Sequence, residues 1–169
     1  MELRRTTIIG YLLALGAAFF FGLSTPINKI LLYEISPLVL SGWIYILSGL
    51  LLIPSFFIKH NYEKIQTQDM NKIVIMVVFG SILGPLAVLY GTSLTSAFQT
   101  SLFLNFEVIF TIIIAFFIFQ ERVGIRGWAG IILIILTLIM WSINFSISGL
   151  SALWGSGIIF LLLGCLFLA

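Results

Sequence analysis

Long stretches without any charged side chain divide this sequence. Residues 6–28, 35–58 and 127–169 contain no Lys, Arg, Asp or Glu, and residues 73–120 contain a single charge, Glu107. A helix needs about 20 apolar residues to cross about 30 Å of hydrocarbon. Each of these runs is therefore long enough to cross a lipid bilayer at least once.

The overall composition agrees with a chain that is surrounded by lipid. Hydrophobic residues make up 61% of it and charged residues 8%, whereas a soluble domain has about a quarter of its residues charged. The apolar runs are continuous rather than alternating, which argues against a transmembrane barrel. The fold class predicted is thus all-α, a polytopic helical bundle in the membrane. A dispersed net charge of +2 gives no reason to expect a nucleic-acid partner.

The two longest runs suit two crossings each, because polar clusters interrupt them. "GTSLTS" at 91–96 and "SISGLS" at 146–151 have the composition of turns. About six transmembrane segments are therefore predicted, near 8–28, 36–57, 73–92, 97–119, 127–145 and 152–169.

The basic residues predict the orientation of the bundle. With the N-terminus in the cytoplasm, only Lys29 lies on the outer side, and all the other basic residues lie on the inner side: Arg4, Arg5, Lys59, Lys64, Lys72, Arg122 and Arg126. Basic residues concentrate on the cytoplasmic side of membrane proteins. We expect a multi-pass protein of the plasma membrane with a cytoplasmic N-terminus.

Motifs for catalysis, metals or cofactors are absent from the sequence. The one cysteine, Cys165, cannot form an internal disulfide or a cysteine-built metal site. The one histidine, His60, lies in a polar stretch without an acid and serine around it. No Gly-rich phosphate loop or H-E-x-x-H motif occurs. The sequence predicts neither an enzyme nor a cofactor.

The segment "FLNFEVIFT", residues 103–111, places a carboxylate inside a predicted span. Seven residues nearly complete two helical turns, so one continuous helix would point four polar side chains within about 40° of one direction. They are Ser96, Thr100, Glu107 and Thr111, and a second polar line contains Ser101 and Asn105. An acid at the centre of a membrane costs about 3 kcal/mol on insertion scales. Glu107 should therefore face the bundle interior or a water-filled cavity.

Two roles for Glu107 are open. It can be a protonated, hydrogen-bonded clamp between helices, or a group that exchanges protons or binds a cationic part of a substrate. We favour the second, because ionisable residues inside membranes commonly mark transport pathways. Polar neighbours that would share this role are Asn105, Thr100 and Thr111.

Other candidate site residues lie at the ends of predicted spans. Lys29 follows Asn28 at the outer end of the first span, and its side chain is expected to extend to the outer interface. The alternative is that it faces the cavity and binds an anionic group or pairs with Glu107. Trp43, Tyr45 and Tyr90 can line an aromatic cavity or anchor the protein at the membrane interface.

Small residues and a weak repeat bear on the architecture. Gly10, Ala14, Ala18 and Gly22 form a four-residue-spaced stripe, which indicates close helix packing or, alternatively, faces that slide during a transport cycle. Sliding 10–22 onto 157–169 aligns Gly10 with Gly157 and Ala17 with Gly164. A coincidence of small residues and a true repeat are both open. A five-helix repeat would enter the membrane a second time from the opposite side, as in many secondary transporters.

The final predicted span has no flanking charge, and its 18 residues extend only about 27 Å. We therefore expect the chain to be part of a longer one. The predicted division is residues 1–145 as a five-helix repeat and residues 146–169 as a loop and the first helix of a second repeat.

Two stretches resemble EamA-type transporters of the drug/metabolite transporter superfamily. The first is "STPINKILLYEISPLVLSGWIYILSGLLLIP" at 24–54. The second is "SLTSAFQTSLFLNFEVIFTIIIAFFIFQERVGIRGWAGIILIILTLIMW" at 93–141, with a small-polar hairpin, an acid and basic residues after the fourth helix, and W-x-G at the start of the fifth. The resemblance covers about residues 8–145. It implies ten helices in two inverted repeats that move a small metabolite or drug-like solute by alternating access, with protons as a possible coupling ion.

Under this resemblance, the partners are a small-molecule substrate, the lipid bilayer, and either the missing second repeat or another copy of the chain. The alternative function is that of a non-transporting membrane protein, such as an assembly partner or a stand-alone half. Two departures stand out. "SGWIYIL" at 41–47 lacks the arginine that many relatives carry, and Glu107 lies where many have a proline. The substrate of a relative therefore cannot be assigned to this chain.

Overall fold

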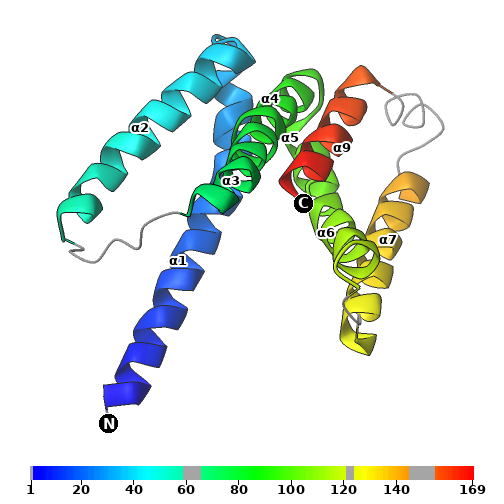
Figure 1. Ribbon diagram of the computed structural model, residues 1–169. Coiled ribbons are helices and arrows are strands. Elements are labelled where there is room, and N and C mark those ends of the chain that lie inside the picture. Colours follow the sequence, from blue (N-terminus) through cyan, green and yellow to red (C-terminus); the bar gives the residue numbers. More distant parts are fainter. Residues whose placement is uncertain (1, 59–65, 121–123, 145–154) are drawn as a thin grey trace.

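The computed structural model describes residues 2–58, 66–120, 124–144 and 155–169, and these residues form helices and short connections without strands (Figure 1). The prediction of an all-α membrane bundle is confirmed. Four helical stretches are long and apolar enough to cross a membrane, namely Thr7–Leu31, Pro37–Pro54, Thr67–Leu94 and Ala97–Phe117. Two shorter apolar helices, Gly127–Thr137 and Ser156–Leu168, complete the searched part of the chain. The predicted division at residues 145 and 146 lies outside the described residues.

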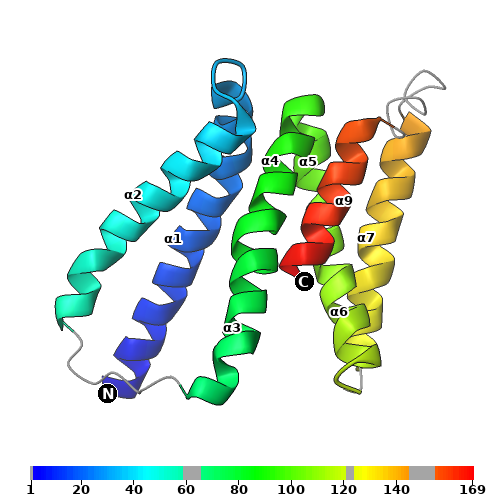
Figure 2. The ribbon, with the colours of Figure 1, turned by 45° about the horizontal axis from the view of Figure 1, so that its top comes forward.

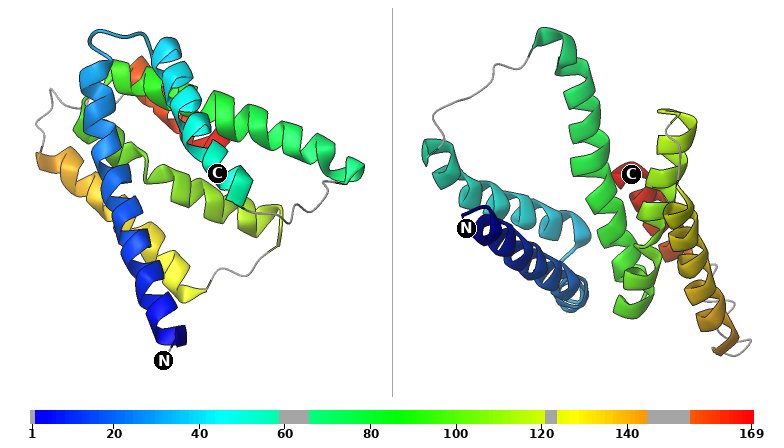
Figure 3. Two further views of the ribbon diagram at one scale, coloured as in Figure 1. Left: turned by 90° about the vertical axis from the view of Figure 1, so that its left-hand side faces the viewer. Right: turned by 90° about the horizontal axis from the view of Figure 1, so that it is seen from below.

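The first two helices lie together at one side of the bundle, and their contacts are mainly with later helices rather than with each other. Helix α1 (Glu2–Leu31) is uninterrupted through Pro26, and α2 (Pro37–Ile58) begins on a proline. Proline suits the first turn of a helix, where its missing N–H has no partner to lose. Figure 3 shows this pair standing beside the group formed by the later helices. Phe19, Phe20 and Leu51 are among its many exposed apolar side chains, as expected for surfaces that face lipid.

The third span contains an irregular segment. It comprises η1 (Thr67–Asp69), α3 (Met70–Met76), the π-helical η2 (Val77–Leu83) and α4 (Gly84–Leu94). In a regular α-helix, the Ser81 carbonyl would accept a hydrogen bond from the residue at position 85, but Pro85 has no N–H. The hydroxyl of Tyr45 on α2 donates to this carbonyl. A side chain of a neighbouring helix thus satisfies a backbone group freed by proline, as lipid surroundings require.

The fourth span is two helices rather than the single regular helix predicted over 97–119. They are α5 (Ala97–Phe103) and α6 (Phe106–Phe117), and a capping box between Ser96 and Gln99 begins the first. The backbone then tightens, because the N–H groups of Asn105 and Glu107 bond to carbonyls three residues earlier. The amide of Asn105 also donates to Ser101 O and Leu102 O. Glu107 consequently lies in the first turn of α6.

The tightest helix packing joins α4 to α9 (Ser156–Leu168), which run antiparallel (Figure 2). Small residues allow the close approach, since a Cβ atom added at Gly91 would lie 2.6 Å from Leu161 Cγ and 2.8 Å from the Gly157 carbonyl oxygen. A Cβ at Gly164 would lie 2.6 Å from Val88 Cγ2. The buried core lies beside this contact, where α5 meets α9. Helix α7 (Ile125–Asn144) packs against α6.

Candidate functional site

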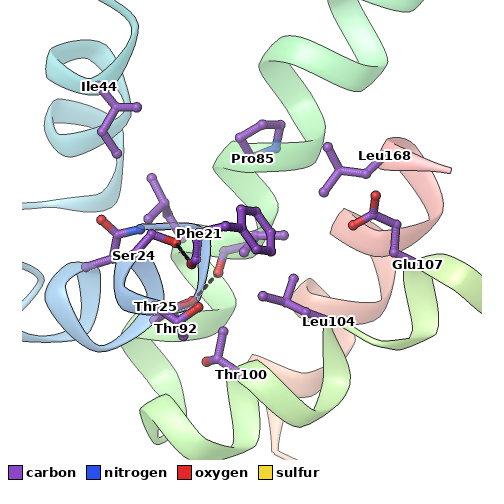
Figure 4. A pocket seen from close by; sticks show the side chains of 13 residues that line it. Phe21, Ser24, Thr25, Ile44, Pro85, Thr92, Thr100, Leu104, Glu107 and Leu168 are labelled. Atoms are coloured by element: carbon purple, nitrogen blue, oxygen red, sulfur yellow. Dashed lines mark hydrogen bonds between the residues drawn. The ribbon is translucent and has the colours of Figure 1, made fainter. Parts of the chain in front are cut away.

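A cavity of about 470 Å³ lies between the α1–α2 pair and the later helices (Figure 4). Its walls are mainly apolar, and five helices and the start of α6 contribute to them. The lining residues are Phe21, Ser24, Thr25, Asn28, Ile44, Pro85, Val88, Leu89, Thr92, Thr100, Leu104, Glu107 and Leu168. This volume is typical of small-molecule sites.

Polar groups occupy separate parts of the cavity wall. Thr25, Thr92 and Thr100 come from three helices and gather on one side, and the carboxylate of Glu107 lies on another side near Leu168 (Figure 4). Thr92 and Thr100 are only 2% and 1% exposed, so both side chains are almost fully buried in the wall. The arrangement can hold a solute whose apolar body contacts the walls and whose polar group reaches Glu107.

Glu107 lines a second cavity as well. This one, of about 400 Å³, lies between α1 and the α5–α6 turn and includes Asn105, Ser101 and Thr25. Glu107 and Thr25 belong to both cavities. An acid in the first turn of a helix also benefits from the positive end of the helix dipole. The tight turn at 104–105 thus gives Glu107 its place where the two spaces meet.

Lys29 contacts backbone rather than the cavity. Its Nζ atom donates to the carbonyls of Thr92 and Ser93, each at 3.0 Å, and lies 5.4 Å from the ring centre of Tyr33. These carbonyls belong to the last turn of α4, which has no intrahelical donors for them and carries a partial negative charge. Lys29 therefore joins α1 to the end of α4.

The alternative pairing of Lys29 with Glu107 is not formed. Within the described ranges, one ion pair is present, between Lys72 and Asp69 at 3.1 Å. In the same residues, no group of three or more His, Cys, Asp or Glu side chains could hold a metal ion.

The structure brings some of the predicted site residues together and separates others. Glu107, Thr100 and Asn28 line the main cavity, and Asn105 lines the second. Thr111 lines neither of these two, and its hydroxyl donates to the backbone carbonyl of Glu107. The expected polar stripe is therefore interrupted by the turn at 104–105.

The three aromatic candidates, Trp43, Tyr45 and Tyr90, lie outside both cavities. Trp43 is 54% exposed on α2. Tyr90 is 38% exposed, and its ring contacts that of Phe160 at 6.0 Å. Their interface-anchoring role stays a prediction.

Sequence reasoning missed three polar lining residues, Ser24, Thr25 and Thr92. The spacing of Ser24 and Asn28, four residues apart on one helix, was a usable signal for a shared face. Thr92 gave no such signal, because its segment "GTSLTS" has the composition of a turn. Its side chain lines the cavity only because α4 extends to Leu94.

Comparison with known proteins decides the family. The model of the EamA-like transporter family matches residues 8–143. The chain belongs to this family. The resemblance drawn from the motifs at 24–54 and 93–141 is thereby confirmed. With its apolar helices, this membership makes the chain a multi-pass integral membrane protein, and it favours a transporter over an enzyme.

The EamA-like chain is also similar to an uncharacterized transporter of Methanothermobacter thermautotrophicus. The two are 30% identical over 143 residues, which is 75% of this chain and 41% of that relative. The chain thus spans less than half the length of that relative. No solved structure matches the chain.

Proposed function

We propose that the chain forms half of a secondary transporter of the plasma membrane, which moves a small metabolite or drug-like solute by alternating access. The observation that carries this proposal is the position of Glu107, which lines two adjoining cavities from the first turn of α6. Transporters commonly bind solutes and coupling ions at interrupted helices near the middle of the membrane. In this mechanism, Glu107 recognises the solute or exchanges the coupling proton.

The packing supports a mechanism in which α1 and α2 move relative to the later helices. The α1 segment Thr7–Leu31 has none of its most apolar window buried, and its contacts within the described bundle are mainly with α4 and α5. It nevertheless contributes Phe21, Thr25 and Asn28 to the cavity. Because α4 and α9 are packed far more tightly, displacement of α1 and α2 against that group would open one side of the cavity. It would break the bonds of Lys29 and Tyr45 to backbone carbonyls of the third span.

The second repeat is proposed to cover α1. Sliding 157–169 onto 10–22 relates the buried face of α9 to an exposed face of α1. The buried residues are Gly157, Ile158, Leu161, Gly164 and Cys165, and their counterparts are Gly10, Tyr11, Ala14, Ala17 and Ala18. Four of these five counterparts are Gly or Ala, which permits close approach. We infer that a helix equivalent to α4 packs there, supplied by the remainder of a longer chain, with another copy of this chain as the alternative source.

The proposal is tested by Glu107→Gln in the full-length protein, reconstituted in vesicles with an imposed pH gradient. Loss of gradient-driven solute flux is expected, with the variant still inserted and monodisperse. Glu34→Gln, an exposed acid outside the cavity, is the matched control and should transport normally. Unchanged flux and an unchanged pH profile in Glu107→Gln would refute the role of this residue. A chain that natively ends at Ala169, is stably expressed and transports nothing would support the non-transporting alternative.

A further inference from the structure

Three of the four hydroxyl groups that line the main cavity, those of Ser24, Thr92 and Thr100, donate their protons to other atoms of the protein. Ser24 donates to Phe21 O at 2.6 Å, and Thr92 donates to Val88 O at 2.7 Å. Thr95 donates to Gly91 O at 2.8 Å. Because Thr95 has one hydroxyl proton, the 3.1 Å contact between Thr95 Oγ1 and Thr100 Oγ1 must use the proton of Thr100. What Ser24, Thr92 and Thr100 can still offer a solute is the lone pairs of their hydroxyl oxygen atoms.

The charged group in the cavity also favours a solute that donates hydrogen bonds. Glu107 is the one charged residue among those that line the two adjoining cavities. The nearest cation in sequence to the lining residues of α1, Lys29, is occupied by two carbonyls of α4. Thr25 and Asn28 are neutral groups that can donate or accept. A solute carboxylate near Glu107 would therefore meet a like charge, and none of the described residues that line the two cavities is a cation that could compensate it.

We propose that the solute is a small amphipathic amine, whose protonated amino group binds the Glu107 carboxylate. This deepens the proposed function and rests on it. An ammonium group has three donors and no acceptor, so it matches the Glu107 carboxylate, which can only accept hydrogen bonds. The apolar part of the solute packs against Phe21, Ile44 and Leu104. A volume of about 470 Å³ accommodates one aromatic ring or a short alkyl chain with its amino group.

The test is a binding measurement on the full-length protein in detergent, with three probes of similar shape and different charge. They are 2-phenylethylamine, the neutral 2-phenylethanol and the anionic 3-phenylpropionate. A charge-assisted hydrogen bond predicts that the amine binds about 10- to 100-fold more tightly than the alcohol, and that the carboxylate binds most weakly. Glu107→Gln should remove the preference for the amine, and Glu34→Gln should retain it.

Equal or tighter binding of 3-phenylpropionate to the unmodified protein would overturn the proposal, whether or not any variant folds. So would a preference for the amine that survives in a monodisperse Glu107→Gln. Flux measurements separate this proposal from the broader one. If the amine binds through Glu107 but no flux is measured, the transport proposal is contradicted and the amine site stands. If other solutes are transported and the amine does not bind, the amine proposal is contradicted and the transport proposal stands.

Discussion

The contact between α4 and α9 makes a sharp prediction at Gly91. An added methyl group would lie 2.6 Å from Leu161 Cγ and 2.8 Å from the carbonyl oxygen of Gly157. The second contact is with backbone, so a change of rotamer cannot relieve it. Overpacking of this kind costs about 1–3 kcal/mol, while replacing Gly by Ala inside a helix gains about 1 kcal/mol. We expect Gly91→Ala to lower the free energy of unfolding by about 0–2 kcal/mol.

Gly130→Ala is the matched control, because a Cβ atom at Gly130 on α7 has nothing within 4 Å. This variant has the same gain in helix propensity without a clash, so it should raise the free energy of unfolding by about 1 kcal/mol. The expected difference between the two variants is thus about 1–3 kcal/mol. For a chain of this size, that difference corresponds to about 2–12 °C in Tm.

The assay is thermal and denaturant unfolding of both variants in the same detergent. A double variant adds Leu161→Ala, which removes the side chain that clashes with the new methyl group. Adjacent residues that clash should show a favourable coupling energy of about 0.5–3 kcal/mol in such a cycle. Equal stabilisation by Gly91→Ala and Gly130→Ala, with additive effects of Leu161→Ala, would refute the close approach of the two helices.

Three further variants test other contacts by the same unfolding assay. Lys29→Met should lower the free energy of unfolding by about 1–3 kcal/mol, because it removes two charge-assisted hydrogen bonds to the end of α4. An unchanged Tm would contradict a stabilising role of these bonds. Tyr45→Phe should cost about 1 kcal/mol by leaving the Ser81 carbonyl without this donor, and a neutral result would show that the bond is dispensable. Gly10→Leu should have little effect in the 169-residue chain, where nothing lies within 4 Å of its Cβ position, but should destabilise a complete two-repeat protein; equal effects in both would argue against a helix covering α1.

The sequence by itself determined that the chain is surrounded by lipid, where its spans approximately lie, and that one span contains an acid. These properties follow from a one-dimensional pattern, because a helix in lipid satisfies its own backbone and needs only a sufficient length of apolar residues. The ordered motifs at 24–54 and 93–141 were also enough to indicate the family. Glu107 could be singled out for the same reason, since a charge is conspicuous in an apolar run.

Only the tertiary structure decided which polar groups meet. Thr25, Thr92 and Thr100 come from three helices, and their approach depends on how α1 and α5 pack against α4. The partner of Lys29 is a pair of backbone carbonyls more than sixty residues away, and no side-chain pattern reveals an acceptor that every residue carries. The turn at 104–105 likewise changes which side chains share a direction. The meeting of the threonines and the bonds of Lys29 depend on contacts between distant helices, and the turn depends on hydrogen bonds within its own segment. The spans, in contrast, depend on local hydrophobicity alone.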